Sequence, residues 1–154
     1  MKAQRRARSI ALQALYEIDC TDHLPGEVLM LRLKSERETG DPISQASEQF
    51  IHDLVSGVLK HRDLLDSFIR DHAPEWPLRQ MAIIDRNVLR MAIFELVMSN
   101  QTPTKVAINE AVELAKLYGS DSTPRFVNGV LGTLATKQAE LVAVFNSISV
   151  HSED

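Results

Sequence analysis

Residues 79–99, RQMAIIDRNVLRMAIFELVMS, decide the fold, because apolar side chains fall on nearly every side of this segment when it is wound as an α-helix. A helix that is apolar almost all round is typical of the centre of a helical bundle. In the rest of the chain, apolar residues recur with the 3.6-residue period of a helix, and the alternation typical of strands is nearly absent. The sequence therefore predicts an all-α protein built around this segment.

Further helices are expected on both sides of that central segment, giving about seven in all. Before it they span residues 4–19, 27–34 and 44–73, and after it residues 103–118, 123–135 and 139–148. Residues 35–42 are expected to form a mobile loop. Pro74 and Pro77 end the third helix, since proline cannot continue the hydrogen-bond ladder. We expect a single domain over residues 1–154, with helical-bundle subdomains at about 1–73 and 78–148.

Three glycines have expected roles in the C-terminal half. Gly119 stands where the helix over 103–118 ends, and it is expected to adopt the left-handed conformation that often terminates a helix. Gly129 and Gly132 lie inside the following helix and are expected to let a neighbouring helix approach closely.

Composition and charge narrow the function classes. With 154 residues, 44% hydrophobic and 25% charged, the chain is expected to be one soluble folded domain without a signal peptide or a membrane span. Its only cysteine, Cys20, suits a reducing cytoplasm. The net charge is -4, yet residues 1–16 carry four basic residues and no acidic one, which leaves -8 on the remainder. Local, oriented binding of nucleic acid is therefore favoured over general coating.

The first helix has two distinct faces. One is apolar and is expected to pack on the core. Arginines, a leucine and a tyrosine share the other face, which is expected to be exposed: Arg5, Arg8, Leu12 and Tyr16. Guanidinium groups pair with phosphates, and an aromatic ring can stack on an unpaired base, so this face favours RNA binding. The alternative is structural, with solvated arginines and a tyrosine that covers a neighbouring helix.

No motif of catalysis or cofactor binding is found in the sequence. The five histidines lack metal-ligand spacing, and neither a phosphate-binding glycine loop nor a nucleophile elbow occurs. A solvated helix face explains Glu110 and Glu113 better than acid and base catalysis. We expect a protein that is not an enzyme and that uses no metal or cofactor.

Several strings together resemble the bacterial NusB family of transcription antitermination factors. They are RRAR leading to QALY (residues 5–8 and 13–16), IDRNVLR with EL (84–90 and 95–96), KVAINEAVELAK after a proline (105–116), and RFVNGVL (125–131). Their order and spacing extend the resemblance over nearly the whole chain, and the string over 105–116 is the most diagnostic. The resemblance implies two helical subdomains, in agreement with the periodicity.

The resemblance also implies partners and site residues. Family members bind ribosomal protein NusE and the boxA element of nascent ribosomal RNA leaders, as part of a complex that keeps RNA polymerase from terminating. The residues expected to bind RNA are Arg5, Arg6, Arg8, Tyr16, Arg125 and Phe126. The residues expected to bind the partner are Leu12, Tyr16, Asp85 and Arg90. From the residues alone, a core position and an RNA contact are about equally favoured for Phe126. Asp85 could instead pair with Arg86 or Arg90.

Two alternatives belong to other classes. One is an RNA-binding appendage of a ribosomal RNA cytosine methyltransferase, since those enzymes carry a domain of similar fold. The other is a homodimeric scaffold that buries the Leu12 and Tyr16 stripe against itself and occludes the RNA face.

Overall fold

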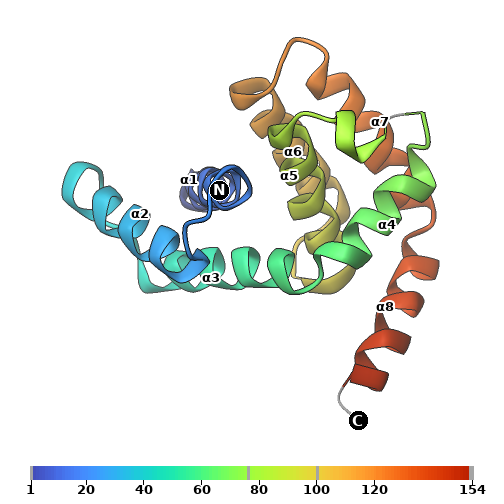
Figure 1. The fold of residues 1–154 in the computed structure, drawn as a ribbon, viewed down its shortest axis with the longest axis horizontal. Helices are drawn as coiled ribbons and strands as arrows, with labels where there is room; N and C mark the ends of the chain where they lie inside the picture. The colour runs from blue at the N-terminus through green and yellow to red at the C-terminus, as the bar shows by residue number, and fades with distance from the viewer. Residues whose placement is uncertain (1, 76, 100, 153–154) are drawn as a thin grey trace. The chain divides into compact units, whose positions relative to one another are not determined.

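The computed structural model describes residues 2–75, 77–99 and 101–152, and the side chains within them other than those of Lys2, Arg79 and residues 149–152. Trp76, inside the expected proline-flanked break, lies outside the described residues. Over these ranges the chain forms eight α-helices, a short 3-10 helix, a π-helix and no strand (Figure 1). The all-α prediction is confirmed.

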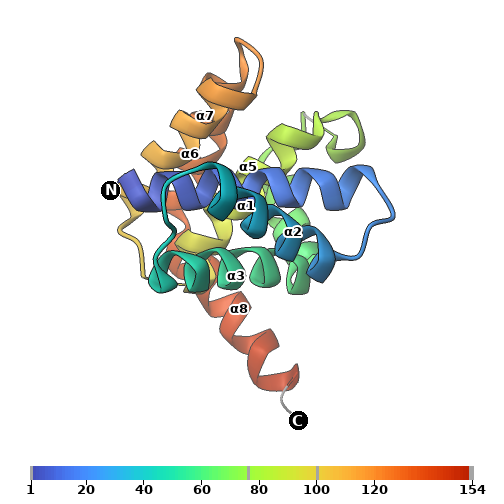
Figure 2. The same cartoon turned by 90° about the vertical axis from the view of Figure 1, so that its left-hand side faces the viewer.

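The first compact unit covers residues 2–60 of the described chain and holds α1 (Lys2–Cys20), α2 (Pro25–Thr39) and α3 (Gln45–Lys60). Within it α1 packs on both α2 and α3 (Figure 2). Helix α2 is longer than expected at both ends, because it begins with Pro25, which suits a first turn, and continues to Thr39. Residues 35–39, expected to be part of a mobile loop, are therefore helical.

The long helix expected over residues 44–73 is two helices, α3 and α4 (Arg62–His72), and His61 between them leaves helical geometry at φ -107° and ψ 18°. The sequence hides this break because Val58 and Leu65 are seven residues apart, which keeps the apolar stripe in phase. The two compact units divide here, between Lys60 and His61, rather than at the expected Pro74–Pro77 break.

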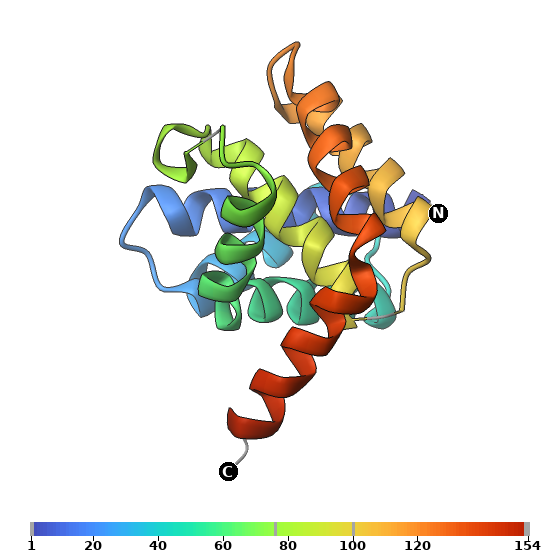
Figure 3. The ribbon, with the colours of Figure 1, turned by 90° about the vertical axis from the view of Figure 1, so that its right-hand side faces the viewer.

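The second unit contains α4, a 3-10 turn (Leu78–Gln80), α5 (Ile83–Ile93), the π-helix η2 (Phe94–Ser99), α6 (Thr104–Tyr118), α7 (Thr123–Thr136) and α8 (Gln138–Ser152). Helix α5 packs against α4, α6 and α7 (Figure 3). Each residue from Asn87 to Ile93 is buried. The central position predicted for the all-round apolar segment is confirmed within this unit. Its continuation is a π-helix rather than further α-helix.

The expected roles of the three glycines are wrong. Gly119 has φ -93°, so it is extended and not left-handed. It is required for another reason, since a Cβ at this position would lie 2.6 Å from the Thr123 Cβ. At Gly129 and Gly132 a Cβ would meet no described neighbouring atom within 4 Å. Their side of α7 is open, and none of the helices that the structure describes packs closely there.

Within residues 138–148, whose side chains the structure describes, the last helix, α8, is packed mainly near its beginning. Leu141 is buried, and the Phe145 ring meets His61 edge-on with 5.2 Å between ring centroids. Farther along, Val144 and Ile148 are exposed as the helix runs away from α6 and α7 (Figure 3). Among the residues that the structure describes, no helix is long and apolar enough to cross a membrane.

Candidate nucleic-acid interface

The three arginines at the start of α1 lie in different environments. Arg5 is exposed. Arg6 is partly covered and forms an ion pair with Glu36 of α2, with 3.2 Å between Nη2 and Oε2. Arg8 is only 2% exposed, and its guanidinium carbon lies 5.2 Å from the centre of the Phe50 ring on α3. This is cation–π geometry.

The expectation that Arg8 lies on an exposed RNA-binding face is wrong. Between residues 7 and 15, α1 is covered on more than one side, so its side chains do not divide into a core face and a solvent face. The guanidinium of Arg8 is used inside the protein, where it holds α1 to α3. A buried cation of this kind is not available to a phosphate.

Leu12 and Tyr16 also lie in different environments. Leu12 is fully buried, so the expectation that it contacts a partner is wrong. Tyr16 is 43% exposed, which leaves much of its ring accessible. A hydrogen bond with Cys20, one turn farther along α1, raises the pKa of Tyr16 above its ordinary value. The phenol is therefore neutral at physiological pH.

Arg5 and Tyr16 remain as an exposed pair on α1. They are eleven residues apart, which places them within about 20° on the helix circumference and about 16 Å apart along its axis. A cation and an exposed ring at this spacing can contact a phosphate and a base of the same single strand, since successive nucleotides span several ångströms. We call Arg5 and Tyr16 the α1 line.

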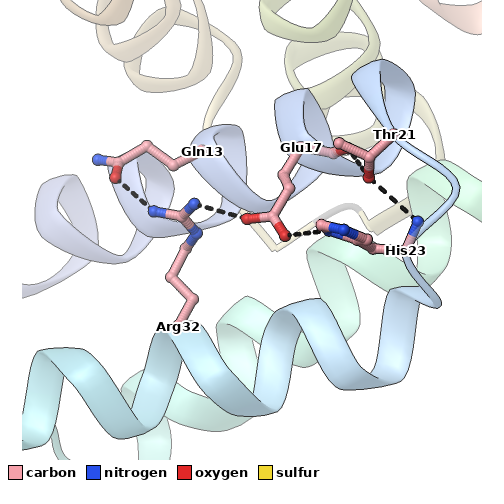
Figure 4. A network of polar contacts seen from close by, with 5 residues as sticks. All are labelled: Gln13, Glu17, Thr21, His23 and Arg32. Carbon is pink, nitrogen blue, oxygen red and sulfur yellow. Dashed lines mark hydrogen bonds and ion pairs between the residues drawn. The ribbon is translucent and has the colours of Figure 1, made fainter.

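A polar network on a neighbouring side of α1 was not predicted from the sequence (Figure 4). Arg32 of α2 donates to Gln13 Oε1 at 2.8 Å and to Glu17 Oε1 at 3.0 Å. His23 lies 3.0 Å from the second oxygen of Glu17. The contacts with His23 and then Arg32 lower the pKa of Glu17. The network ties α2 to α1. It could not be predicted from the sequence, because the residue pattern of one helix does not show which arginine of another helix will contact it.

In the second unit, three residues singled out from the sequence meet at one pocket of about 410 Å³. Asp85 comes from the first turn of α5, whereas Arg125 and Phe126 come from the first turn of α7. The other lining residues are Gln80, Met81, Ala82, Ser122 and Thr123. Arg125 is exposed and Phe126 is partly exposed, so the pocket offers a cation and part of a ring to solvent.

The α5 and α7 sides of this pocket are joined by a hydrogen bond. Thr123 donates from its hydroxyl to Asp85 Oδ1 at 3.1 Å, and the same hydroxyl accepts from the Ser120 amide at 3.0 Å. Burial raises the pKa of Asp85, and the hydrogen bond from Thr123 opposes that rise. Thr123 was not predicted as a site residue. Its position explains Gly119, since its side chain occupies the space that a Cβ at Gly119 would need.

Arg90 does not belong to this pocket. It is 5% exposed and makes two hydrogen bonds with the carboxylate of Asp66 on α4, at 2.7 Å and 2.9 Å. The expectation that Arg90 binds a partner is wrong, because it links α5 to α4 inside the second unit. Asp85 instead accepts a hydrogen bond from Thr123, whereas the carboxylate that Arg90 pairs with is that of Asp66.

The exposed side chains at these two surfaces are suited to binding nucleic acid. The α1 line and the pocket lined by Asp85, Arg125 and Phe126, which we call the Arg125 pocket, each combine a cation with an aromatic ring. This pairing can contact phosphates and unstacked bases. Within the described ranges, no group of three histidine, cysteine, aspartate or glutamate side chains is placed to hold a metal ion.

Comparison with known proteins places the chain in a family. The family model described as the NusB family matches residues 5–136. The transcription antitermination protein NusB of Roseiflexus sp. (strain RS-1) is 48% identical over 139 residues, which cover 89% of this chain and 94% of that protein. The relative from Dehalococcoides mccartyi (strain CBDB1), also a transcription antitermination protein NusB, is 49% identical over 90% of this chain and 93% of its own length.

Solved structures agree with the fold. T. maritima NusB superposes with a TM-score of 0.78 at 31% identity, covering 88% of this chain and 92% of that one. The family model and these relatives each span most of the chain, and the residues matched by the family model include the α1 line and the Arg125 pocket. The chain therefore belongs to the NusB family.

Proposed function

We propose that this protein is a transcription antitermination factor that binds single-stranded boxA-type RNA of ribosomal RNA leaders together with ribosomal protein NusE. In this role it would join the antitermination complex on RNA polymerase and support processive transcription. Membership of the NusB family supports antitermination, because the relatives carry that function in their names. The observation that carries RNA binding is the exposed α1 line, where a cation and an accessible ring share one side of a helix.

The RNA contacts are assigned to exposed or partly exposed groups. Arg5 and Arg6 pair with phosphates, and Tyr16 stacks on a base. At the second surface, the charge of Arg125 and the partial positive charge at the start of α7 both favour an anion. Phe126 provides an edge of aromatic surface next to them.

NusE binding is assigned to Tyr16 and Asp85. Asp85 is half-buried, and the hydrogen bond from Thr123 engages one of its two carboxylate oxygens, Oδ1. It therefore keeps an acceptor for a donor group of a partner. Since Leu12 is buried, the alternative of a homodimer that closes over a Leu12 and Tyr16 stripe loses half of its proposed contact surface.

The proposal is for binding without catalysis, in the bacterial cytoplasm where transcripts are made. The methyltransferase-appendage alternative has no observation in its favour, since both relatives are matched over more than nine-tenths of their own length and both are NusB proteins. No metal or cofactor is needed for the contacts described.

RNA binding over a salt series, with and without NusE, tests the proposal. Arg5→Gln, Tyr16→Ala and Arg125→Gln should each weaken binding to a boxA-type RNA, and each arginine variant should flatten the salt dependence by about 0.7 per lost phosphate contact. Loss of stacking on Tyr16 should cost about 1 to 3 kcal/mol. Arg70→Gln, at an exposed arginine on α4, is the matched control. Equal binding by all four variants and the parent would contradict the proposal.

A further inference from the structure

Arg6 of α1 is held by the C-terminal end of α2. Its guanidinium is 3.2 Å from the carboxylate of Glu36, which lies thirty residues along the chain. It also lies over the backbone at Gly40, where an added Cβ would be 2.8 Å from Arg6 Nη2. The position of Arg6 is thus set by the Glu36 carboxylate and by the backbone at Gly40, both at the C-terminal end of α2.

That helix end is suited to a cation. Gly40 donates its amide to the Glu36 carbonyl at 2.9 Å, closing the last turn of α2. The carbonyl end of a helix carries partial negative charge, which adds to the charge of the Glu36 carboxylate. The turn is anchored from its other side, because Arg37 pairs with Glu48 of α3 and donates from Nε at 2.7 Å. Glu36 is therefore presented to Arg6 by a fixed turn.

The Arg6–Glu36 pair is nevertheless open to exchange. The two side chains are 30% and 31% exposed, and an ion pair of that exposure contributes little to stability. Arg8, two residues farther along α1, is the contrast, since it is 2% exposed and cannot leave without opening the core. A phosphate can replace the carboxylate, because both are charged acceptors that a guanidinium binds through charge-assisted hydrogen bonds. The Arg6–Glu36 ion pair is therefore weak enough for an RNA phosphate to displace the Glu36 carboxylate from Arg6.

We propose that Glu36 competes with RNA phosphates for Arg6, so that the C-terminal turn of α2 sets how tightly this end of α1 binds RNA. The inference rests on the proposed RNA-binding function and adds a residue that limits it. When Arg6 pairs with Glu36, the charge of Arg6 is neutralised, and of the two arginines assigned to RNA on α1, Arg5 and Arg6, it no longer contributes. When RNA binds, the guanidinium exchanges the carboxylate for a phosphate, and Glu36 is left to solvent.

The test is RNA binding by Glu36→Gln, which keeps the size and an oxygen acceptor but removes the charge. At low salt it should bind a boxA-type RNA about two- to fivefold more tightly than the parent, the range that an exposed ion pair allows. The gain should shrink as salt rises, because exposed pairs are screened. The matched control is Glu38→Gln, which removes the same charge from an exposed position two residues along α2. Its gain should be smaller.

A second background separates competition from simple repulsion. In Arg6→Gln protein, Glu36→Gln should give no further gain, since the group competed for is gone. A gain that persists there, a gain matched by Glu38→Gln, or no gain at all would each overturn the inference. If Arg6→Gln binds RNA as the parent does while Arg5→Gln and Tyr16→Ala lose binding, the inference fails and the proposed function stands. If the parent itself binds no RNA, both fail.

Discussion

Arg90 of α5 and Asp66 of α4 form a two-bond ion pair, with 2.7 Å from Nε to Oδ1 and 2.9 Å from Nη2 to Oδ2. The side chains are 6% and 17% exposed, so both charges are largely removed from water. A pair of this kind is costly to break because it leaves one charge buried without its partner. Its function is to fix α4 against α5, the central helix of the second unit.

Removing Asp66 should therefore destabilise the protein. We expect Asp66→Ala to lower the free energy of unfolding by about 3 kcal/mol, because Arg90 keeps its buried charge but loses the carboxylate that accepts two of its hydrogen bonds. Chemical denaturation measures this loss. Asp71→Ala, at an exposed position on the same helix, is the control and should change the free energy by about 0.5 kcal/mol or less. A small effect at Asp66 would mean that Arg90 finds another acceptor or reaches water.

The sequence predicted the place of α5 well and the environment of α1 poorly, for related reasons. A helix with apolar residues on nearly every side is buried only at the centre of a bundle, so the buried position of residues 87–93 is predicted correctly. On α1 the apolar positions mark one packed side, but a sequence pattern does not show how many neighbours a helix has. Arg8 and Leu12 look like a polar face with an apolar insertion, yet both are buried.

Leu12 and Tyr16 should therefore respond in opposite ways to truncation. Leu12→Ala should cost about 2 to 5 kcal/mol of stability, because it leaves a cavity in a fully buried position. Tyr16→Ala should cost much less stability, since its ring is 43% exposed, and should mainly weaken RNA binding. Thermal or chemical unfolding and RNA titration are measured on both variants. RNA affinity lost in Leu12→Ala while its stability is unchanged would place Leu12 in the interface and contradict the assignment.

The Arg125 pocket shows which parts of a binding site can be predicted from a sequence and which cannot. Asp85, Arg125 and Phe126 were singled out by resemblance, and they do line one pocket. From the sequence, Thr123, which connects the two sides of the pocket, is expected only to begin a helix. Its hydrogen bond to Asp85 spans thirty-eight residues of sequence, and such a pairing depends on how α5 and α7 pack.

Gly119 and Gly129 should give opposite results when each is replaced by alanine. At Gly119 the new Cβ would lie 2.6 to 2.7 Å from three atoms of the Thr123 side chain, and the loss should be about 1 to 3 kcal/mol. At Gly129, inside α7 and open to solvent, alanine should stabilise the helix by about 0.5 to 1 kcal/mol. Unfolding free energies measure both. A loss at Gly129 as large as that at Gly119 would show that α7 does not tolerate a side chain there.

Asp85 should make stability depend on pH in a defined direction. Burial raises its pKa in the folded protein, so the protonated form is favoured by folding and that contribution is lost as pH rises through the folded pKa. Asp85→Asn keeps an oxygen acceptor for Thr123 but has no charge, so its stability relative to the parent should increase from about pH 4 upward and then level off. Unfolding measured across that range tests this. Thr123→Val removes the opposing hydrogen bond, so it should raise the pKa of Asp85 further in a carboxyl NMR titration. A difference between Asp85→Asn and the parent that stays constant with pH would show that the carboxylate is not penalised by burial.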